Sequence, residues 1–173
     1  IYQMPYRPTP LQFKVDGKTY FNERPISTQQ TAFSFVSQLR SWMPREIGGV
    51  IWFGNDDANM VAYTPVYCGN TVQPECYNTP GADAVTFSDK NAFWVCNWVS
   101  NMVYPRYSQI FPELQTLRDS LEASYFAQQA DFEKKAMNLY ATDKQVALRM
   151  LNDYSVEKAQ QMLAEWKNLA IRI

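Results

Sequence analysis

The sequence contains no histidine. A Ser-His-Asp triad or a Cys-His pair therefore cannot be assembled from its 173 residues, and the commonest metal-binding side chain is absent. The sequence also has no GxSxG elbow, no SxxK motif and no Gly-rich phosphate loop. We expect neither a metal nor a cofactor, and the residues alone indicate no self-sufficient active site.

Neither sign of charge is in excess, and long apolar runs are missing. The 16 basic and 17 acidic residues give a net charge of −1, with no basic stripe, so we expect no nucleic-acid partner. No run of 18 apolar residues occurs, and we expect no membrane span. The first ten residues lack both an initiator Met and the apolar core of a signal peptide, which suits a processed chain or a fragment.

Cysteine is scarce, with Cys68, Cys76 and Cys96 as its three occurrences. None belongs to a CxxC pair, which argues against a zinc or redox motif. The odd number leaves at least one thiol without a partner in the chain. A Cys68–Cys76 bridge and three packed thiols both fit the sequence.

Aromatic residues are abundant at 15% of the chain. A core built from rings explains them, and a stacking surface for sugars or peptides is the alternative. The composition changes near residue 83, from Pro, Gly, Thr and aromatics to Ala, Gln, Glu, Lys and Leu. This order predicts an α+β fold, with an extended lead-in and antiparallel β meander over residues 1–83 and a helical segment over residues 84–173.

Several runs in the first segment have strand patterns. Residues 1–26, with four prolines, predict an extended lead-in. Within it, FKVDGKTYF predicts two short strands around an Asp16-Gly17 turn. Residues 31–40 alternate, and two β-rich runs flank the polar cluster at residues 55–59, so residues 31–67 predict a three-stranded antiparallel meander. Pro65 places the third strand at an edge or at a bulge. The alternation gives the first strand one mostly apolar face, formed by Phe33, Phe35, Ser37 and Leu39.

The second segment predicts several helices. Ser88 is a candidate N-cap for a helix that is apolar nearly all round and therefore buried. Pro105 and Pro112 then predict breaks or kinks. An apolar stripe follows, at Leu114, Leu117, Leu121, Tyr125, Phe132, Ala136 and Leu139.

Two caps are predicted in the last third of the chain. Thr142 with Gln145 fits a capping box for a short helix. Ser155 is the predicted cap of the last helix. That helix carries a core-facing stripe with 3–4 spacing at Val156, Ala159, Leu163, Trp166, Ala170 and Ile173.

The adjacent carboxylates Asp56 and Asp57 invite comparison with an acid/base pair. Neighbouring residues on a turn point apart, so the sequence favours a role in the turn over general acid/base catalysis. No catalytic residue is therefore assigned within this chain.

A long stretch of the sequence resembles a known family. Residues 23–77, ERPISTQQTAFSFVSQLRSWMPREIGGVIWFGNDDANMVAYTPVYCGNTVQPECY, are similar to a late block of dipeptidase A-like, cysteine-type N-terminal-nucleophile hydrolases. The preceding PYRPTPLQFKVDGKTYF and the following FSDKNAFWVCNWVSNMVYPRYS resemble the adjoining blocks. The resemblance covers about residues 5–130 of the chain.

The resemblance implies a bacterial dipeptidase with a four-layer αββα core, cytoplasmic or exported. The nucleophile would be a cysteine at residue 1 of the mature protein, with its own α-amine as base. Such an amine titrates at about 7.7–8.0, so no histidine is needed. Ile1 offers no nucleophile, and the three cysteines are internal. We therefore expect a C-terminal portion that is inactive alone, with its own N-terminal catalytic half and dipeptides as partners.

The resemblance also points to candidate pocket residues. Arg24 and Arg40 lie in matching blocks where related hydrolases place an arginine near the nucleophile, with a structural salt bridge as the alternative. Trp52, Thr64 and Tyr67 are further candidates for a cleft wall. The missing half predicts an exposed apolar face that favours self-association. Two other functions stay open, namely an aromatic-rich carbohydrate- or peptide-binding module and a non-catalytic interaction domain that docks through its last helix.

Overall fold

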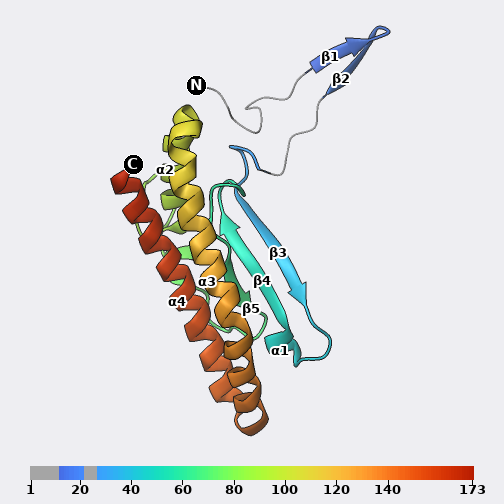
Figure 1. The fold of residues 1–173 in the computed structure, drawn as a ribbon, viewed down its shortest axis with the longest axis vertical. Helices are drawn as coiled ribbons and strands as arrows, with labels where there is room; N and C mark the ends of the chain where they lie inside the picture. Colours follow the sequence, from blue (N-terminus) through green and yellow to red (C-terminus); the bar gives the residue numbers. More distant parts are fainter. Residues whose placement is uncertain (1–11, 22–26) are drawn as a thin grey trace.

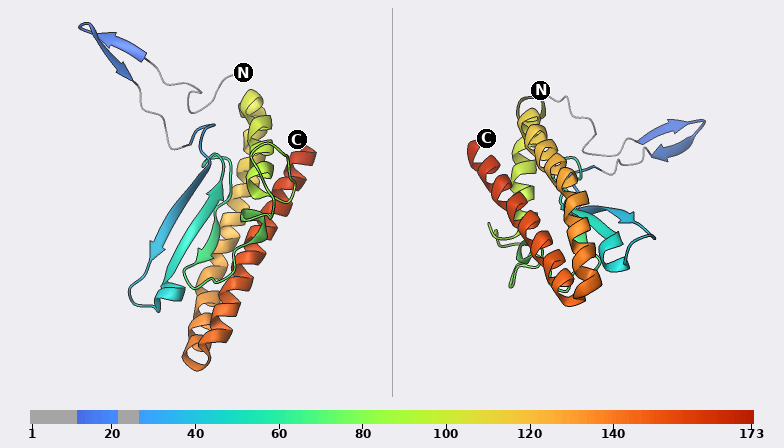
Figure 2. Two further views of the ribbon diagram at one scale, coloured as in Figure 1. Left: turned by 180° about the vertical axis from the view of Figure 1, so that it is seen from behind. Right: turned by 60° about the horizontal axis from the view of Figure 1, so that its bottom comes forward.

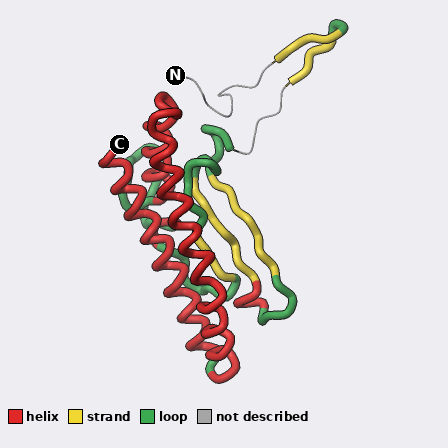
Figure 3. The backbone as a smooth tube through the Cα atoms, in the orientation of Figure 1, coloured by secondary structure: helices red, strands yellow, loops and turns green. Residues whose placement is uncertain are grey.

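The computed structural model describes residues 12–21 and 27–173. Antiparallel strands precede the long helices, as predicted, in an α+β arrangement, and one short helix, α1, lies between two of the strands (Figure 3). The elements are β1 Gln12–Val15, β2 Lys18–Phe21, β3 Phe33–Leu39, α1 Arg45–Gly48, β4 Gly49–Asn55, β5 Thr64–Tyr67, α2 Ala92–Val103, α3 Tyr107–Thr142 and α4 Lys144–Arg172, with short 3₁₀ turns at Glu75–Tyr77 and Tyr104–Arg106. No helix among these is long and apolar enough to cross a membrane.

The first two strands form the predicted hairpin. Strands β1 and β2 pair antiparallel, and both turn residues, Asp16 and Gly17, have positive φ, which a tight primed turn requires. Every residue of both strands is exposed. The rest of the predicted lead-in, residues 1–11 and 22–26, lies outside the described residues.

The predicted meander is also confirmed. Strands β3, β4 and β5 form an antiparallel sheet in that order. Pro65 lies in β5, an edge strand, where its missing N–H leaves no ladder bond unmade. Helices α3 and α4 run side by side along one face of the three-stranded sheet, and β3 is the strand of that sheet farthest from them (Figures 1 and 2).

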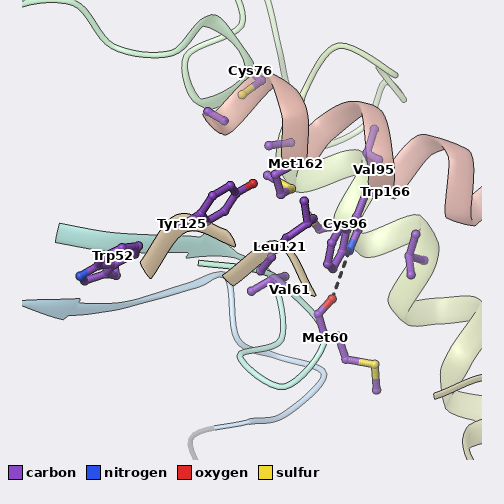
Figure 4. Packing of buried hydrophobic residues seen from close by; sticks show 14 of the residues in the cluster. Trp52, Met60, Val61, Cys76, Val95, Cys96, Leu121, Tyr125, Met162 and Trp166 are labelled. Carbon is purple, nitrogen blue, oxygen red and sulfur yellow. Dashed lines mark hydrogen bonds between the residues drawn. The ribbon is translucent and has the colours of Figure 1, made fainter. Parts of the chain in front are cut away.

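The core lies between the sheet, α2 and the α3–α4 pair. Trp166 of α4 is fully buried beside Cys96, Val95 and Leu121, and its indole N–H donates to the carbonyl of Met60 at 3.2 Å (Figure 4). The predicted stripe of α3 supplies most of that helix's buried core residues. Of the predicted α4 stripe, Ala159, Trp166 and Ala170 are buried in the core, and α4 adds four residues outside the stripe, Leu151, Tyr154, Met162 and Leu169. Seven aromatic side chains are buried in this core, whereas nine of the described ones, among them Phe33, Phe35 and Trp42, are exposed. The expectation that the rings form the core is therefore met only in part.

Helix α2 differs from its prediction in two respects. Its N-cap is Asn91, whose side chain accepts from the N–H of Trp94, and not Ser88. The helix is buried on one face only, because Trp98 and Asn101 are exposed on the other. Its apolar outer face misled the prediction.

Pro105 falls in the turn between α2 and α3, as expected, whereas α3 runs through Pro112 in its second turn.

The last two predicted helices are one. Helix α4 spans 29 residues and is capped by Asp143, which accepts from the N–H groups of Gln145 and Val146. Thr142 is the last residue of α3, so the capping-box prediction was wrong by one position. Ser155 is buried in mid-helix and caps nothing. Packing against α2, α3 and β5 carries the helix past it.

Candidate functional site

The two faces of the three-stranded sheet have different neighbours. Side chains of Val50, Trp52 and Tyr67 point toward the helices and are buried. Trp52 packs on Phe126 of α3, with ring centroids 4.8 Å apart. The opposite face carries the apolar row of β3 that alternation predicted, and it has little cover. The exposed fractions are 56% for Phe33, 55% for Phe35, 77% for Leu39 and 38% for Ile51.

This open face is bounded on the β5 side. Tyr77 meets the ring of Phe53 edge-on at 5.0 Å and shares a 2.5 Å hydrogen bond with the hydroxyl of Thr64. The uncovered part therefore lies over β3 and the neighbouring residues of β4. An exposed row of this kind on a globular protein marks a contact surface.

A pocket of about 410 Å³ lies at the α1 end of the sheet. Its walls include Leu39 and Gly49 on the open side, with Trp42, Arg45 and Cys68 around them. The Cys68 thiol is exposed and unbridged, and Cys76 and Cys96 are also free, so the Cys68–Cys76 bridge is not formed. Burial raises the pKa of Cys76 to about 12 and also raises the pKa of Cys96 well above its usual value. The predicted burial of Cys96 is confirmed, whereas Cys68 is not packed inside.

Arg40 also lines this pocket, but its side chain is engaged elsewhere. The guanidinium donates twice to the carboxylate of Glu133, at 2.5 and 2.6 Å, and also to the carbonyls of Ile47 and Gly48. Both partners of the ion pair are nearly buried. This is the structural ion pair weighed above as the alternative, and a role of Arg40 toward substrate stays a prediction. Arg24 lies outside the described residues.

Glu133 is a centre that the sequence reading missed. Its Oε1 also accepts from the Tyr67 hydroxyl at 3.0 Å and from the Gln129 amide at 2.9 Å. Burial, and then the Glu133 charge, raise the pKa of Tyr67, so this phenol remains a donor. The sequence did contain a signal for its burial. Glu133 lies at helical spacing from Tyr125 and Ala136, and therefore on the buried face of α3.

The loop after β4 is held by a second polar cluster. Asp56 accepts from Ser100 at 2.5 Å and from Asn97 at 3.2 Å. Asp57 accepts from Tyr104 at 2.9 Å and from Ser27. Both carboxylates are buried, and burial raises the pKa of Asp56. The pair organises a turn, as predicted, but inside the protein, with partners on α2, in the 3₁₀ turn after it and in the segment before β3.

The three further candidates for a cleft wall face different ways. Trp52 and Tyr67 point toward the helices, and Thr64 is buried against Tyr77 on the other face. The structure therefore does not bring them together. Among the described residues, no group of three or more Cys, Asp or Glu side chains is arranged to hold a metal ion.

The comparisons with known proteins agree with the resemblance drawn above. The model of Peptidase family C69 matches residues 5–120. The chain therefore belongs to Peptidase family C69. It is also 22% identical over 149 residues to a protein described as "Probable dipeptidase B" from Streptococcus pyogenes serotype M1. That match covers 86% of this chain and 29% of the relative, so the chain spans less than a third of the relative's length.

Proposed function

We propose that this chain is the C-terminal part of a dipeptidase, and that the nucleophile is a cysteine at the mature N-terminus of a polypeptide that begins upstream of Ile1. The observation that carries the proposal is the match of the family model to residues 5–120. The relative named as a probable dipeptidase supports the substrate class. The limited coverage of that relative supports an upstream part, which would hold the nucleophile.

The chemistry of the residues agrees with this division. An N-terminal cysteine provides its thiol and the amine that takes up the proton in one residue, so no histidine is required. Such an amine titrates at about 7.7–8.0 and can accept a proton near neutral pH. Within the described chain, Cys76 and Cys96 are buried thiols with raised pKa values, which leaves them protonated and unreactive.

The open sheet face gives the upstream part a place to bind. Phe33, Phe35, Leu39 and Ile51 lie on the face opposite the helices. A second sheet packed there would bury them and complete an αββα sandwich, with its core about 10 Å thick. A stacking module for sugars has less support, because the exposed Tyr20, Trp42 and Trp98 lie on three separate segments.

The test compares the complete gene product with residues 1–173 alone. We expect the complete protein to hydrolyse members of a dipeptide panel, and to lose that activity when its N-terminal cysteine is replaced by alanine. The shorter chain should be inactive and should self-associate in light scattering. Turnover by the purified shorter chain would refute the division of labour. A complete protein without turnover on any dipeptide would refute the substrate class.

A further inference from the structure

Strand β3 has a free edge, and its main-chain groups alternate between β4 and that edge. The N–H of Asp56 donates to Ala32 and the N–H of Arg40 donates to Gly48, at 2.8 and 3.1 Å. Even-numbered residues therefore direct their N–H and C=O groups to β4, in the register that pairs Phe35 with Phe53. The odd-numbered residues direct theirs away from β4. Within the described chain, only β4 pairs with β3.

The side chains of β3 also differ from those of a protected edge. Apolar groups are exposed on both faces, with Phe35 at 55% on the open side and Val36 at 59% on the helix side. No charged residue and no proline interrupts the strand, although these are the usual means of keeping an edge unpaired. Strands β1 and β2, in contrast, each carry a lysine, Lys14 and Lys18.

A groove runs along this edge on the helix side. Its cavity volume is about 470 Å³, and its walls include Val36, Trp52 and Phe126, with the polar Tyr63, Glu122 and Gln129 behind them. A strand added beside β3 would lie about 4.8 Å away, with every second side chain directed to this side of the sheet. Its apolar side chains would then fill the groove and cover Val36.

We propose that a strand from the polypeptide upstream of this chain pairs with the free edge of β3 and places apolar side chains in the groove at Val36, Trp52 and Phe126. The inference rests on the proposed function for the existence of an upstream part. The aligned relative extends well beyond the matched region, which makes up 29% of its length, so ample chain is available. The lysine-bearing strands of the β1–β2 hairpin are poorer candidates for the same place.

Residue-resolved hydrogen exchange on the unmodified complete protein tests the pairing. With the edge filled, the amides of Phe33, Phe35, Ser37 and Leu39 are protected as strongly as those of the even-numbered residues, and the alternation along β3 is lost. Slow even-numbered and fast odd-numbered amides would overturn the proposal. Protection that disappears on dilution to the monomer would also overturn it, because a second copy would then fill the edge.

Photo-cross-linking identifies the occupant. With Val36 replaced by p-benzoylphenylalanine in the complete protein, we expect a cross-link to a residue upstream of Ile1, whereas the same group at exposed Lys134 on α3 gives no such product. A cross-link to residues 12–21 would overturn the proposal. Dipeptide turnover of the same preparation separates the two claims. If the protein hydrolyses dipeptides but amide protection still alternates along β3, the added strand is refuted and the dipeptidase function stands. If all β3 amides are protected but no dipeptide is hydrolysed, the dipeptidase function is refuted and the added strand stands.

Discussion

Adjacent residues of β4 show how unlike the two faces of the sheet are. Trp52 faces α3, is 6% exposed, and combines a ring contact with a hydrogen bond to Gln38. Ile51, one position earlier, faces the other way and is more than a third exposed. Both are large apolar side chains in a well-paired strand. The strand pattern is therefore that of a sheet buried on both faces, and one of those faces has little cover within the described chain.

The contrast between the two faces separates the contacts that this chain makes by itself from those that we expect the upstream part to supply. On the helix side, β4 and β5 are covered by rings, an ion pair and hydrogen bonds around Tyr67 and Glu133, and the exposed position is Val36 at the β3 edge. The open side has a row of phenylalanines and aliphatic groups that water must solvate. Burying such side chains stabilises a protein by about 1.5–3 kcal/mol each. The open side is therefore where a covering part would add the most stability.

The largest expected effect comes from truncating each of this adjacent pair. Trp52→Ala should lower the free energy of unfolding by about 3–5 kcal/mol, because it removes a buried ring. Ile51→Ala should cost about 1 kcal/mol in residues 1–173 alone but about 2–5 kcal/mol in the complete protein, where we expect the face to be covered. Urea denaturation measures both. An Ile51→Ala cost that stays near 1 kcal/mol in the complete protein would mean that the open face remains open.

Breaking the ion pair on the helix side should have a similar effect. Glu133→Ala leaves the nearly buried Arg40 guanidinium without its carboxylate, and we expect a loss of about 3–5 kcal/mol. The double variant Arg40→Met, Glu133→Leu should recover part of that loss, since it removes both charges but leaves the buried Tyr67 hydroxyl without its acceptor. Dipeptide turnover of the recovered double variant then tests Arg40. Activity near that of the parent would assign it to structure, and lost activity with restored stability would assign it to substrate binding.

A smaller effect is expected at the start of α4. Asp143→Ala removes the acceptor for two amide N–H groups and should cost about 1 kcal/mol. Ser155→Ala is the matched control, because the Ser155 hydroxyl is buried without a partner and alanine favours a helix. Thermal unfolding should show a loss for the first variant and none for the second. If only Ser155→Ala lowered the thermal stability, Ser155 and not Asp143 would be the helix cap.

These residues also show what the sequence could and could not predict. Alternation, the Asp-Gly turn and Pro65 give the hairpin, the meander and the edge position of β5, because strand patterns and turns are local. Helix ends were harder, since Asp143 and Thr142 are both good caps and only packing decides which one the helix uses. The predicted break at Ser155 is absent because the buried stripe continues through it.

The polar clusters could not be found from local patterns. Glu133 lies 93 residues from Arg40, and Ser100 lies 44 residues from Asp56. Each partner alone resembles a solvated surface residue, and only the fold brings the two together. The resemblance to a peptidase family was recovered because it depends on a long ordered match and not on any one contact.

The smallest expected effect leaves stability unchanged and concerns the thiols. In residues 1–173, Cys68 is exposed beside the open face, whereas Cys76 and Cys96 are buried. A thiol reagent should label Cys68 rapidly and the other two only on unfolding, because burial keeps both in the unreactive thiol form. Mass spectrometry of the labelled, still folded chain gives the site and the rate.

In the complete protein we expect labelling of Cys68 to slow, since Cys68 follows β5 and lies opposite Gly49 at the end of the open face. Rapid labelling of Cys96 in the folded chain would contradict the burial argument. Equal Cys68 rates in the two proteins would show that the added part leaves this end of the sheet uncovered.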